Sequence, residues 1–178
     1  MAGLLPPLVL MTDDDRLADP LAAAQALPRG ALVIVRARDG ARRADLAQAM
    51  LALARRRGLV VLVAADPALA ARLGADGLHL PQARAREAAH WRATHPNWLI
   101  SAARHGAGPS ASHLDFVVLS AVFPTASHQG RAALGAARAN ALARAARLPV
   151  YALGGIDARN ARLLHGFIGI AAVGALAL

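Results

Sequence analysis

Cysteine is absent from this 178-residue chain, which excludes disulfides, thiolate metal sites and cysteine nucleophiles. Long hydrophobic runs are absent as well. The longest candidate, residues 167–178, contains Gly169 and Gly174 and is shorter than the roughly 18 residues that a membrane span needs. The apolar N-terminus lacks the basic leading segment of a secretory signal. We therefore expect a cytoplasmic protein with no membrane partner.

Lysine is also missing, glutamate occurs once, as Glu87, and aromatic residues make up only 3% of the chain. A formal net charge of +9 would suit a nucleic-acid binder. All 20 basic residues are arginines in an alanine-rich chain, however, which indicates a compositional bias. So few aromatic residues cannot build a base-stacking platform. We expect no nucleic-acid partner and keep a nucleic-acid-binding module as an alternative.

Hydrophobic residues, by contrast, make up 56% of the chain, enough to bury a substantial core. Short and nearly continuous apolar runs are typical of strands that are buried on both faces. They occur at residues 8–13, 31–36, 59–64, 77–80, 98–102, 115–119, 149–153 and 168–173. Helical patterns lie between them at 41–57, 68–73, 83–93, 132–147 and 160–164, and we expect a loop at 106–112.

Strands that alternate with helices predict an α/β protein with a parallel sheet. Eight such strands predict one closed (β/α)₈ TIM barrel that spans residues 1–178 as a single domain. An open doubly wound sheet is the alternative fold. The chain ends almost directly after the eighth run, so we expect a reduced or missing last helix. A partner subunit would then cover that flank, which favours a homodimer.

Function in such barrels resides at the carboxyl ends of the strands. Gly154 and Gly155 follow the seventh run, and Val173 and Gly174 follow the eighth. Paired glycines let backbone N–H groups approach an anion closely, so these turns predict a phosphate-binding site. The alternative is that the glycines form ordinary turns.

A hydroxyl-rich loop follows the sixth run and predicts a substrate loop. Its candidate binding or catalytic residues are Thr125, Ser127 and His128, and a solvated loop histidine is the alternative for His128. His79 lies inside the fourth run, where a hydrogen-bonded core histidine is the expectation. The remaining histidines show no metal-binding spacing.

Two arginines end the second run. Arg36 and Arg38 share one face of an extended segment, from which they could clamp phosphate oxygens. The alternative is that one of them pairs with Asp39. The sequence has no Ser-His-Asp signature and no Walker loop.

Three segments resemble thiamin phosphate synthase and its relative TenI. They are GADGLHLPQ at 74–82, VVLSAVFPTASHQG at 117–130 and LPVYALGGI at 148–156. The resemblance covers nearly the whole chain and implies a TIM barrel. It also implies the chemistry of the synthase, which joins a hydroxymethylpyrimidine diphosphate to a thiazole phosphate and releases diphosphate with Mg²⁺. TenI is a thiazole tautomerase on the same scaffold.

Carried over residue by residue, the resemblance implies a phosphate-binding role for Gly155 and retains Arg36. Arg38 keeps a cation where the family has lysine, whereas Ile34 replaces the glutamine that holds the pyrimidine. The catalytic histidine of the tautomerase falls at Ala121. Further substrate-binding candidates match positions after the fourth and fifth strands, namely Gln82, Arg84 and His105.

The metal-binding aspartates of the family fall at Ala65 and Arg84, so we expect no metal ligands here, although Mg²⁺ is the cofactor that the family implies. Arg36, Arg38 and Arg84 could instead form a metal-free clamp for the leaving diphosphate. The leading hypothesis is a synthase-type transferase acting on phosphorylated thiazole and pyrimidine compounds. The alternative is a divergent TenI-like protein that binds or isomerises a thiazole phosphate or thiamin phosphate.

Overall fold

The computed structural model describes residues 5–107, 112–125 and 132–173. All eight expected strands are present: β1 (Leu8–Met11), β2 (Leu32–Val35), β3 (Val60–Ala64), β4 (Gly77–Leu80), β5 (Leu99–Arg104), β6 (Phe116–Leu119), β7 (Val150–Leu153) and β8 (Gly169–Ala172). They are hydrogen-bonded in chain order, and the sheet closes into a barrel. The prediction of a TIM barrel is therefore confirmed, and the open doubly wound sheet is wrong.

The helices are α1 (Pro20–Gln25), α2 (Gly40–Arg57), α3 (Pro67–Leu73), α4 (Ala88–Thr94) and α5 (Gly135–Ala145), with 3₁₀ segments η1 (Gln82–Glu87) and η3 (Ala161–Leu163). The expectation of one helix over 83–93 is wrong, because η1 and α4 share that stretch. Helix α1 was not predicted. The expected loop at 106–112 and the end of the chain extend into 108–111 and 174–178, outside the described residues.

Local capping explains where two of the short helices begin. Asp19 and Asp66 each accept a hydrogen bond from a backbone N–H three residues ahead, at 2.9 Å, and a proline opens each helix directly after them. Such a carboxylate satisfies one of the unpaired N–H groups of the first turn, and proline lacks the N–H that would otherwise go unpaired. Helix α3 then ends at Gly74, whose φ is +65°.

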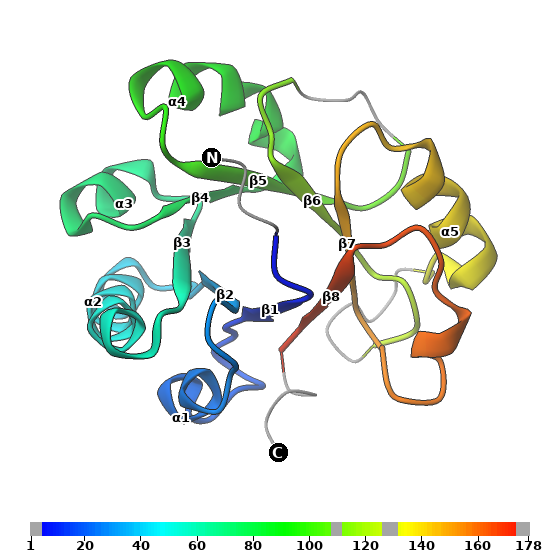
Figure 1. Cartoon of the computed structure of the whole chain (residues 1–178), viewed down its shortest axis with the longest axis horizontal. Coiled ribbons are helices and arrows are strands. Elements are labelled where there is room, and N and C mark those ends of the chain that lie inside the picture. Colours follow the sequence, from blue (N-terminus) through cyan, green and yellow to red (C-terminus); the bar gives the residue numbers. More distant parts are fainter. Residues whose placement is uncertain (1–4, 108–111, 126–131, 174–178) are drawn as a thin grey trace. The chain divides into compact units, whose positions relative to one another are not determined.

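The chain divides into two compact units. Unit 1 comprises Met1–His79, Asn97–Leu99 and Ala172–Leu178, and unit 2 comprises Leu80–Pro96 and Ile100–Ala171. In unit 1, α2 and α3 lie on the outer side of β2 and β3 (Figure 1). In unit 2, α5 packs on β6 and β7 through a core that includes Val117, Leu119, Ala139, Ala143 and Val150.

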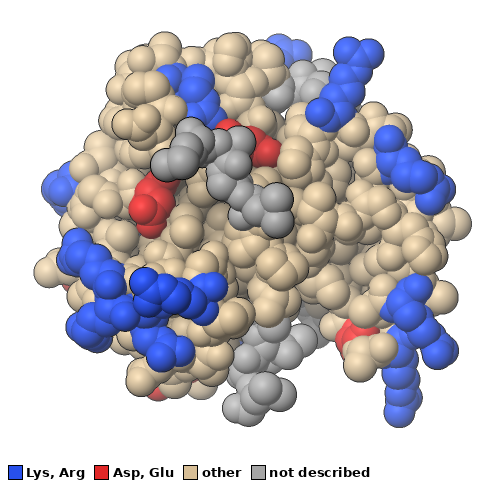
Figure 2. Space-filling view, viewed as in Figure 1, with Lys and Arg blue, Asp and Glu red and all other residues tan. Residues whose placement is uncertain are grey.

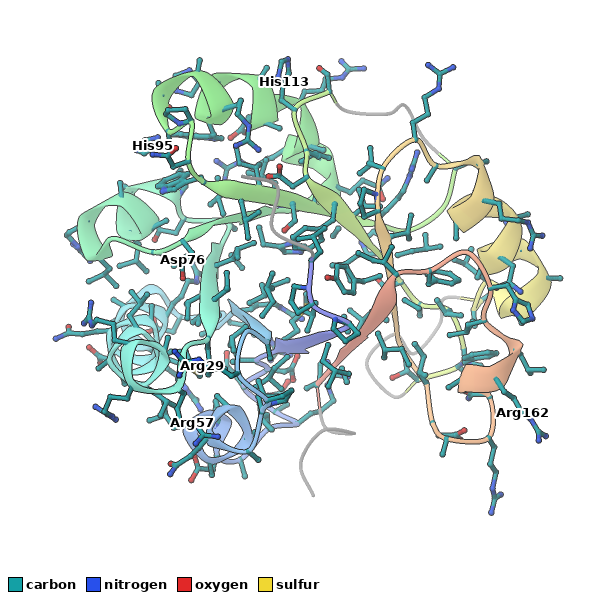
Figure 3. The ribbon with its side chains drawn as sticks, viewed as in Figure 1. Arg29, Arg57, Asp76, His95, His113 and Arg162 are labelled. Atoms are coloured by element: carbon teal, nitrogen blue, oxygen red, sulfur yellow. The ribbon has the colours of Figure 1, made fainter. Side chains whose placement is uncertain are left out.

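Two aspartates pin the amino ends of neighbouring strands by the same device. Asp76, which precedes β4, accepts a hydrogen bond from the Val61 N–H of β3 at 2.7 Å (its position is labelled in Figure 3). In unit 2, Asp115 precedes β6 and accepts one from the Ile100 N–H of β5 at 2.7 Å. These bonds satisfy strand-end N–H groups that the sheet leaves unpaired. None of the described helices has the length and apolar character needed to cross a membrane.

Candidate functional site

Gly154 and Gly155 form a turn directly after β7. Both have left-handed backbone, with φ of +102° and +62°. A Cβ on Gly155 would overlap the Pro124 carbonyl oxygen, and a Cβ on Gly154 would lie 3.1 Å from the Cα of Ala121. Glycine is therefore required at both positions, by conformation and by the close approach of the segment that follows β6.

The carbonyls of this turn are bonded, whereas two of its N–H groups are not. The Gly154 carbonyl accepts from the Phe123 N–H at 3.0 Å, and the Gly155 carbonyl accepts from Nδ2 of Asn160 at 2.8 Å. Among the described residues, the N–H groups of Gly155 and Ile156 have no hydrogen-bond partner. Gly155 is exposed. Consecutive unpaired N–H groups at left-handed glycines form a concavity suited to an oxyanion.

Other predicted residues of the phosphate site and substrate loop are only partly described. Thr125 follows the segment that packs on Gly155 and is half-buried. Val173 follows β8, is buried and belongs to unit 1. Ser127, His128 and Gly174 lie outside the described residues, so their roles stay predictions.

His105 and Gln82 lie together at the ends of β5 and β4 within unit 2. The His105 N–H donates to Oε1 of Gln82 at 2.7 Å. The His105 ring faces Ser120, with Nδ1 at 3.0 Å from the Ser120 carbonyl oxygen and 3.1 Å from its Oγ. The structure therefore brings together two of the predicted binding residues and adds Ser120, which sequence reasoning missed.

Arg84 is engaged with the single glutamate of the chain. Its Nε and Nη2 donate to the two oxygens of Glu87 at 2.7 and 2.8 Å, and Nε1 of Trp91 donates to Glu87 at 3.3 Å. The side-chain hydrogen bond from Arg84 is the main cause that lowers the pKa of Glu87. A spacing of three residues suits the 3₁₀ geometry of η1, in which side chains three positions apart eclipse. Arg84 is thus a cation already paired with a carboxylate.

In unit 1, Arg36 is paired with a buried carboxylate that follows β1. Oδ2 of Asp13 lies 3.4 Å from Nη1 of Arg36 and 2.9 Å from Nη2 of Arg16. The Thr12 hydroxyl bridges the Arg36 backbone, donating to its carbonyl at 2.7 Å and accepting from its N–H at 2.8 Å. The hydrogen bond from Arg16 is the largest cause that lowers the pKa of Asp13. One anion thus faces two guanidinium groups.

Arg38 is held by the same loop after β1. Its guanidinium pairs with Asp15, and its backbone N–H donates to Oδ2 of Asp14 at 2.8 Å. Asp39 instead caps α2, accepting from the Arg42 N–H at 2.7 Å. In the described ion pairs, Arg36 pairs with Asp13 and Arg38 with Asp15, whereas the alternative had one of them pairing with Asp39. Both arginines are exposed, as their predicted shared face requires, while Ala37 between them is buried.

His79 is a buried histidine of β4, as predicted. It is 4% exposed, and its desolvation, followed by the charge of Arg36, lowers its pKa to about 4. A buried neutral imidazole is therefore the stable form near neutral pH. Ile34 is fully buried in β2 and offers no polar atom at the position of the family's glutamine.

A separate group of arginines lies at the amino ends of the strands of unit 1. Arg29 precedes β2, and Arg55, Arg56 and Arg57 end α2 before β3. Figure 2 shows basic side chains gathered in this region, where Figure 3 labels Arg29 and Arg57. Within the described ranges, none of the four forms an ion pair. These charges belong to the end of the strands opposite to Arg36 and Arg38.

Comparison with families of known proteins finds a match that spans most of the chain. A family model described as thiamine monophosphate synthase matches residues 8–176. The chain belongs to this family. The resemblance inferred from the three sequence segments is thereby confirmed.

Relatives within the thiamine monophosphate synthase family include two enzymes of known name. The chain is 33% identical to the thiamine-phosphate synthase of Thioalkalivibrio sulfidiphilus over 157 residues, which cover 80% of this chain and 72% of that protein. It is 37% identical to the thiamine-phosphate synthase of Thermus thermophilus over 149 residues, covering 76% and 69%. A solved thiamine phosphate pyrophosphorylase from Pyrococcus furiosus shares the fold, with a TM-score of 0.74 at 20% identity over 93% of this chain and 84% of that one.

The family resemblance places the Mg²⁺-binding aspartates at Ala65 and Arg84. Mg²⁺ prefers carboxylate oxygens, whereas the matching positions hold Ala65, which has no ligating atom, and Arg84, a cation. Among the described residues, no three His, Asp or Glu side chains gather closely enough to hold a metal ion. Ala65 nevertheless has a φ of +61°, in the left-handed region that asparagine and aspartate adopt more readily than alanine.

The aspartate triplet after β1 is the group of residues that sequence reasoning missed. Asp13 forms an ion pair with Arg36, Asp14 with Arg42 and Asp15 with Arg38, and all three arginines follow β2 in the chain. A signal was present, because a run of acidic residues at one strand end and a run of basic residues at the next face each other in a parallel sheet.

Proposed function

We propose that this chain is a synthase-type transferase that joins a hydroxymethylpyrimidine diphosphate to a thiazole phosphate. The observation that carries the proposal is the turn at Gly154 and Gly155, where two backbone N–H groups lack partners among the described residues. We assign the phosphate group of the thiazole to these groups, with Thr125 beside them. Membership of the thiamine monophosphate synthase family supports the reaction type.

The transfer needs one bond to break and one to form. The C–O bond between the pyrimidine methylene carbon and diphosphate breaks, and its electron pair leaves with the diphosphate. The lone pair of the thiazole nitrogen then forms the C–N bond, and no proton is required to move. Guanidinium groups stabilise a departing diphosphate by charge and by paired hydrogen bonds. Arg36 and Arg38 are the residues proposed for this role in unit 1, and Arg84 keeps its proposed role as an anion-binding residue in unit 2.

Ligand binding to the phosphate site is tested by thermal unfolding with thiazole phosphate and with the same thiazole lacking the phosphate. A specific ligand raises the midpoint of unfolding, since it binds only the folded chain. We expect a shift with the phosphate ester alone. Gly155→Ala should abolish that shift, whereas Gly74→Ala is the matched control, because Gly74 also has a positive φ but a Cβ added there would meet no atom within 4 Å. Equal shifts for both compounds would contradict the proposal.

Release of diphosphate separates a transferase from a binder. The wild-type chain, both substrates and a metal chelator are combined, and diphosphate is measured. We expect the wild-type chain to release diphosphate in the presence of the chelator, because the residues at the family's metal positions cannot ligate Mg²⁺. We expect Arg84→Ala to release less. Diphosphate release only after Mg²⁺ is added would contradict the metal-free clamp but would still support the proposed transferase activity.

A second candidate is a divergent TenI-like protein that binds or isomerises a thiazole phosphate. The replacement of both metal-binding positions by Ala65 and Arg84 favours it over ordinary synthase activity. Binding needs only the turn after β7, whereas isomerisation needs a base, and the family's catalytic histidine is replaced by Ala121. A thiazole-phosphate shift without diphosphate release would select this candidate.

We also propose a homodimer with no nucleic-acid partner. Light scattering at micromolar concentration tests the first statement, and a monomer would contradict it. RNA and DNA titrations at two salt concentrations test the second, because binding through arginine and phosphate contacts would weaken steeply as salt rises.

A further inference from the structure

The side chain of Asn160 ties the turn after β7 to the backbone just beyond it. Its Nδ2 donates to the Gly155 carbonyl at 2.8 Å, and its Oδ1 accepts from the Asp157 N–H at 2.9 Å. A carbonyl can only accept and an N–H can only donate, so these two partners fix the orientation of the side-chain amide. Asn160 thus bridges the two ends of the segment 155–157.

Asp157 in turn holds the backbone of Asn160. Its Oδ1 accepts from the N–H groups of Arg159 and Asn160, at 2.8 and 2.9 Å. The Ala161 N–H donates to the Asp157 carbonyl at 2.9 Å. The backbone and the side chain of Asn160 are therefore fixed by separate contacts, an arrangement that limits how far the side-chain amide can move.

Each peptide group of the turn after β7 has its carbonyl held by a different neighbour. The Gly154 carbonyl accepts from the Phe123 N–H at 3.0 Å, and the Gly155 carbonyl accepts from Asn160. Both peptide bonds are trans, so the N–H of each peptide group points away from its own carbonyl. The contact with Phe123 therefore sets the direction of the Gly155 N–H. In the same way, the contact with Asn160 sets the direction of the Ile156 N–H.

The peptide group between Gly155 and Ile156 needs a restraint from outside the turn. The close approach of Pro124 demands glycine at position 155, because a Cβ there would overlap the Pro124 carbonyl oxygen. A residue without a Cβ opposes rotation of the adjoining peptide plane only weakly. The feature that requires glycine therefore leaves this peptide group free to turn, and the hydrogen bond from Asn160 opposes that rotation.

We propose that Asn160 is a positioning residue, which holds the Gly155–Ile156 peptide group so that the Ile156 N–H faces the phosphate group of the thiazole. A donor that is already held in its binding orientation does not have to be ordered when the oxyanion arrives. This role rests on the proposed function, because it needs a phosphate ester at the turn after β7. Asn160 acts through the peptide group and does not itself contact the phosphate.

Amide NMR of the full chain, saturated with thiazole phosphate, tests this role residue by residue. In the wild-type chain the amide protons of Gly155 and Ile156 should both move downfield on binding, because each donates a charge-assisted hydrogen bond. In Asn160→Ala the shift of Ile156 should shrink, whereas Gly155 should keep its shift, since Phe123 still holds the preceding carbonyl. Equal losses at both amides would indicate that the whole turn is disturbed and would overturn the role.

The affinity for thiazole phosphate provides a second measurement. Asn160→Ala should weaken binding roughly tenfold, because the freed peptide group has to be ordered on binding. Asn140→Ala is the matched control. The Asn140 side chain makes the same two kinds of bond in unit 2, donating to the Leu163 carbonyl and accepting from the His165 N–H, both at 2.9 Å. This control should lose folding stability in urea but bind thiazole phosphate as the wild-type chain does.

The outcomes separate this role from the proposed function. If thiazole phosphate binds to the wild-type chain and the Ile156 amide proton does not move, the role of Asn160 is overturned, a result that needs no variant. Wild-type affinity in Asn160→Ala, or an equal loss of affinity in Asn140→Ala, overturns it as well. If thiazole phosphate does not bind at all, the proposed function fails and this inference fails with it.

Discussion

The guanidinium of Arg84 grips the carboxylate of Glu87 through two parallel hydrogen bonds of 2.7 and 2.8 Å. This fork sits in η1, at the position where the family resemblance places a metal-binding aspartate. The chain thus carries a cation where the resemblance implies an anion, and the only glutamate in the sequence offsets that cation. An arriving anion must compete with Glu87 for Arg84.

Glu87→Gln tests that competition. Removing the carboxylate charge should strengthen binding of inorganic diphosphate in the presence of chelator by about two- to threefold, since the neutral amide holds Arg84 less tightly. Both side chains of the pair are 38% exposed, so unfolding free energy should change by no more than about 0.5 kcal/mol. Calorimetric titration measures the first effect and urea unfolding the second. Arg86→Ala, a neighbouring exposed arginine, is the control, and weaker diphosphate binding in Glu87→Gln would contradict the prediction.

Asp13→Asn tests the buried carboxylate that faces Arg16 and Arg36. The lowered pKa of Asp13 means that its charge stabilises the folded chain above the unfolded-state pKa. That stability is lost as pH falls through the folded-state pKa, below the ordinary value of 3.8. At neutral pH the variant should lose about 1–2 kcal/mol, a value reduced because both guanidinium groups are partly exposed.

Unfolding by urea at pH 7 and at pH 3 provides the measurement for Asp13. The difference in free energy of unfolding between wild type and Asp13→Asn should be smaller at pH 3, where the wild-type carboxylate begins to take up its proton. Asp45→Asn, at an exposed position of α2, should change little at either pH. A difference in free energy of unfolding that grows on acidification would contradict the prediction.

His79 should make stability depend on pH in a different window. Its pKa is lowered from 6.5 to about 4 in the folded chain, so the unfolded chain takes up the proton first on acidification. The contribution of neutral His79 to the free energy of unfolding is fully present above pH 6.5. It is lost as pH falls toward 4, by at most about 1.4 kcal/mol per pH unit. His79→Gln should flatten this slope between pH 6.5 and 4.5, and His165→Ala should not. An unchanged slope in His79→Gln would assign the dependence to other groups.

The folded chain should become more stable when the side chain of Ala65 is removed. At φ +61° the Cβ strains the backbone, and left-handed geometry costs an L-residue roughly 1–2 kcal/mol. Ala65→Gly should therefore stabilise the chain by about 1 kcal/mol in urea unfolding. Ala64→Gly, one residue earlier in β3, is the matched control and should destabilise by a similar amount, because it loses buried surface and gains chain entropy on unfolding. Destabilisation in both would show that the backbone relaxes around Ala65.

Local patterns in the sequence predicted most of the strands and helices of the barrel. The strands are short apolar runs because both of their faces are buried, and each lies within a few residues of its predicted bounds. Helix α1 escaped prediction although Asp19 and Pro20 repeat the signal of Asp66 and Pro67, since its six residues show no helical periodicity. The break between η1 and α4 also escaped, because 3₁₀ and α-helical spacings differ little over so short a stretch.

By itself, the sequence determined the barrel class, the family and the glycines of the turn after β7, since these depend on runs and neighbours within a few positions of the chain. Only the tertiary structure decided which charges meet. Arg36 and Arg38 lie more than twenty residues from Asp13 and Asp15, and His105 lies 15 residues from Ser120. Such pairs form because adjacent parallel strands bring their carboxyl ends side by side, a proximity that spacing along the chain does not encode.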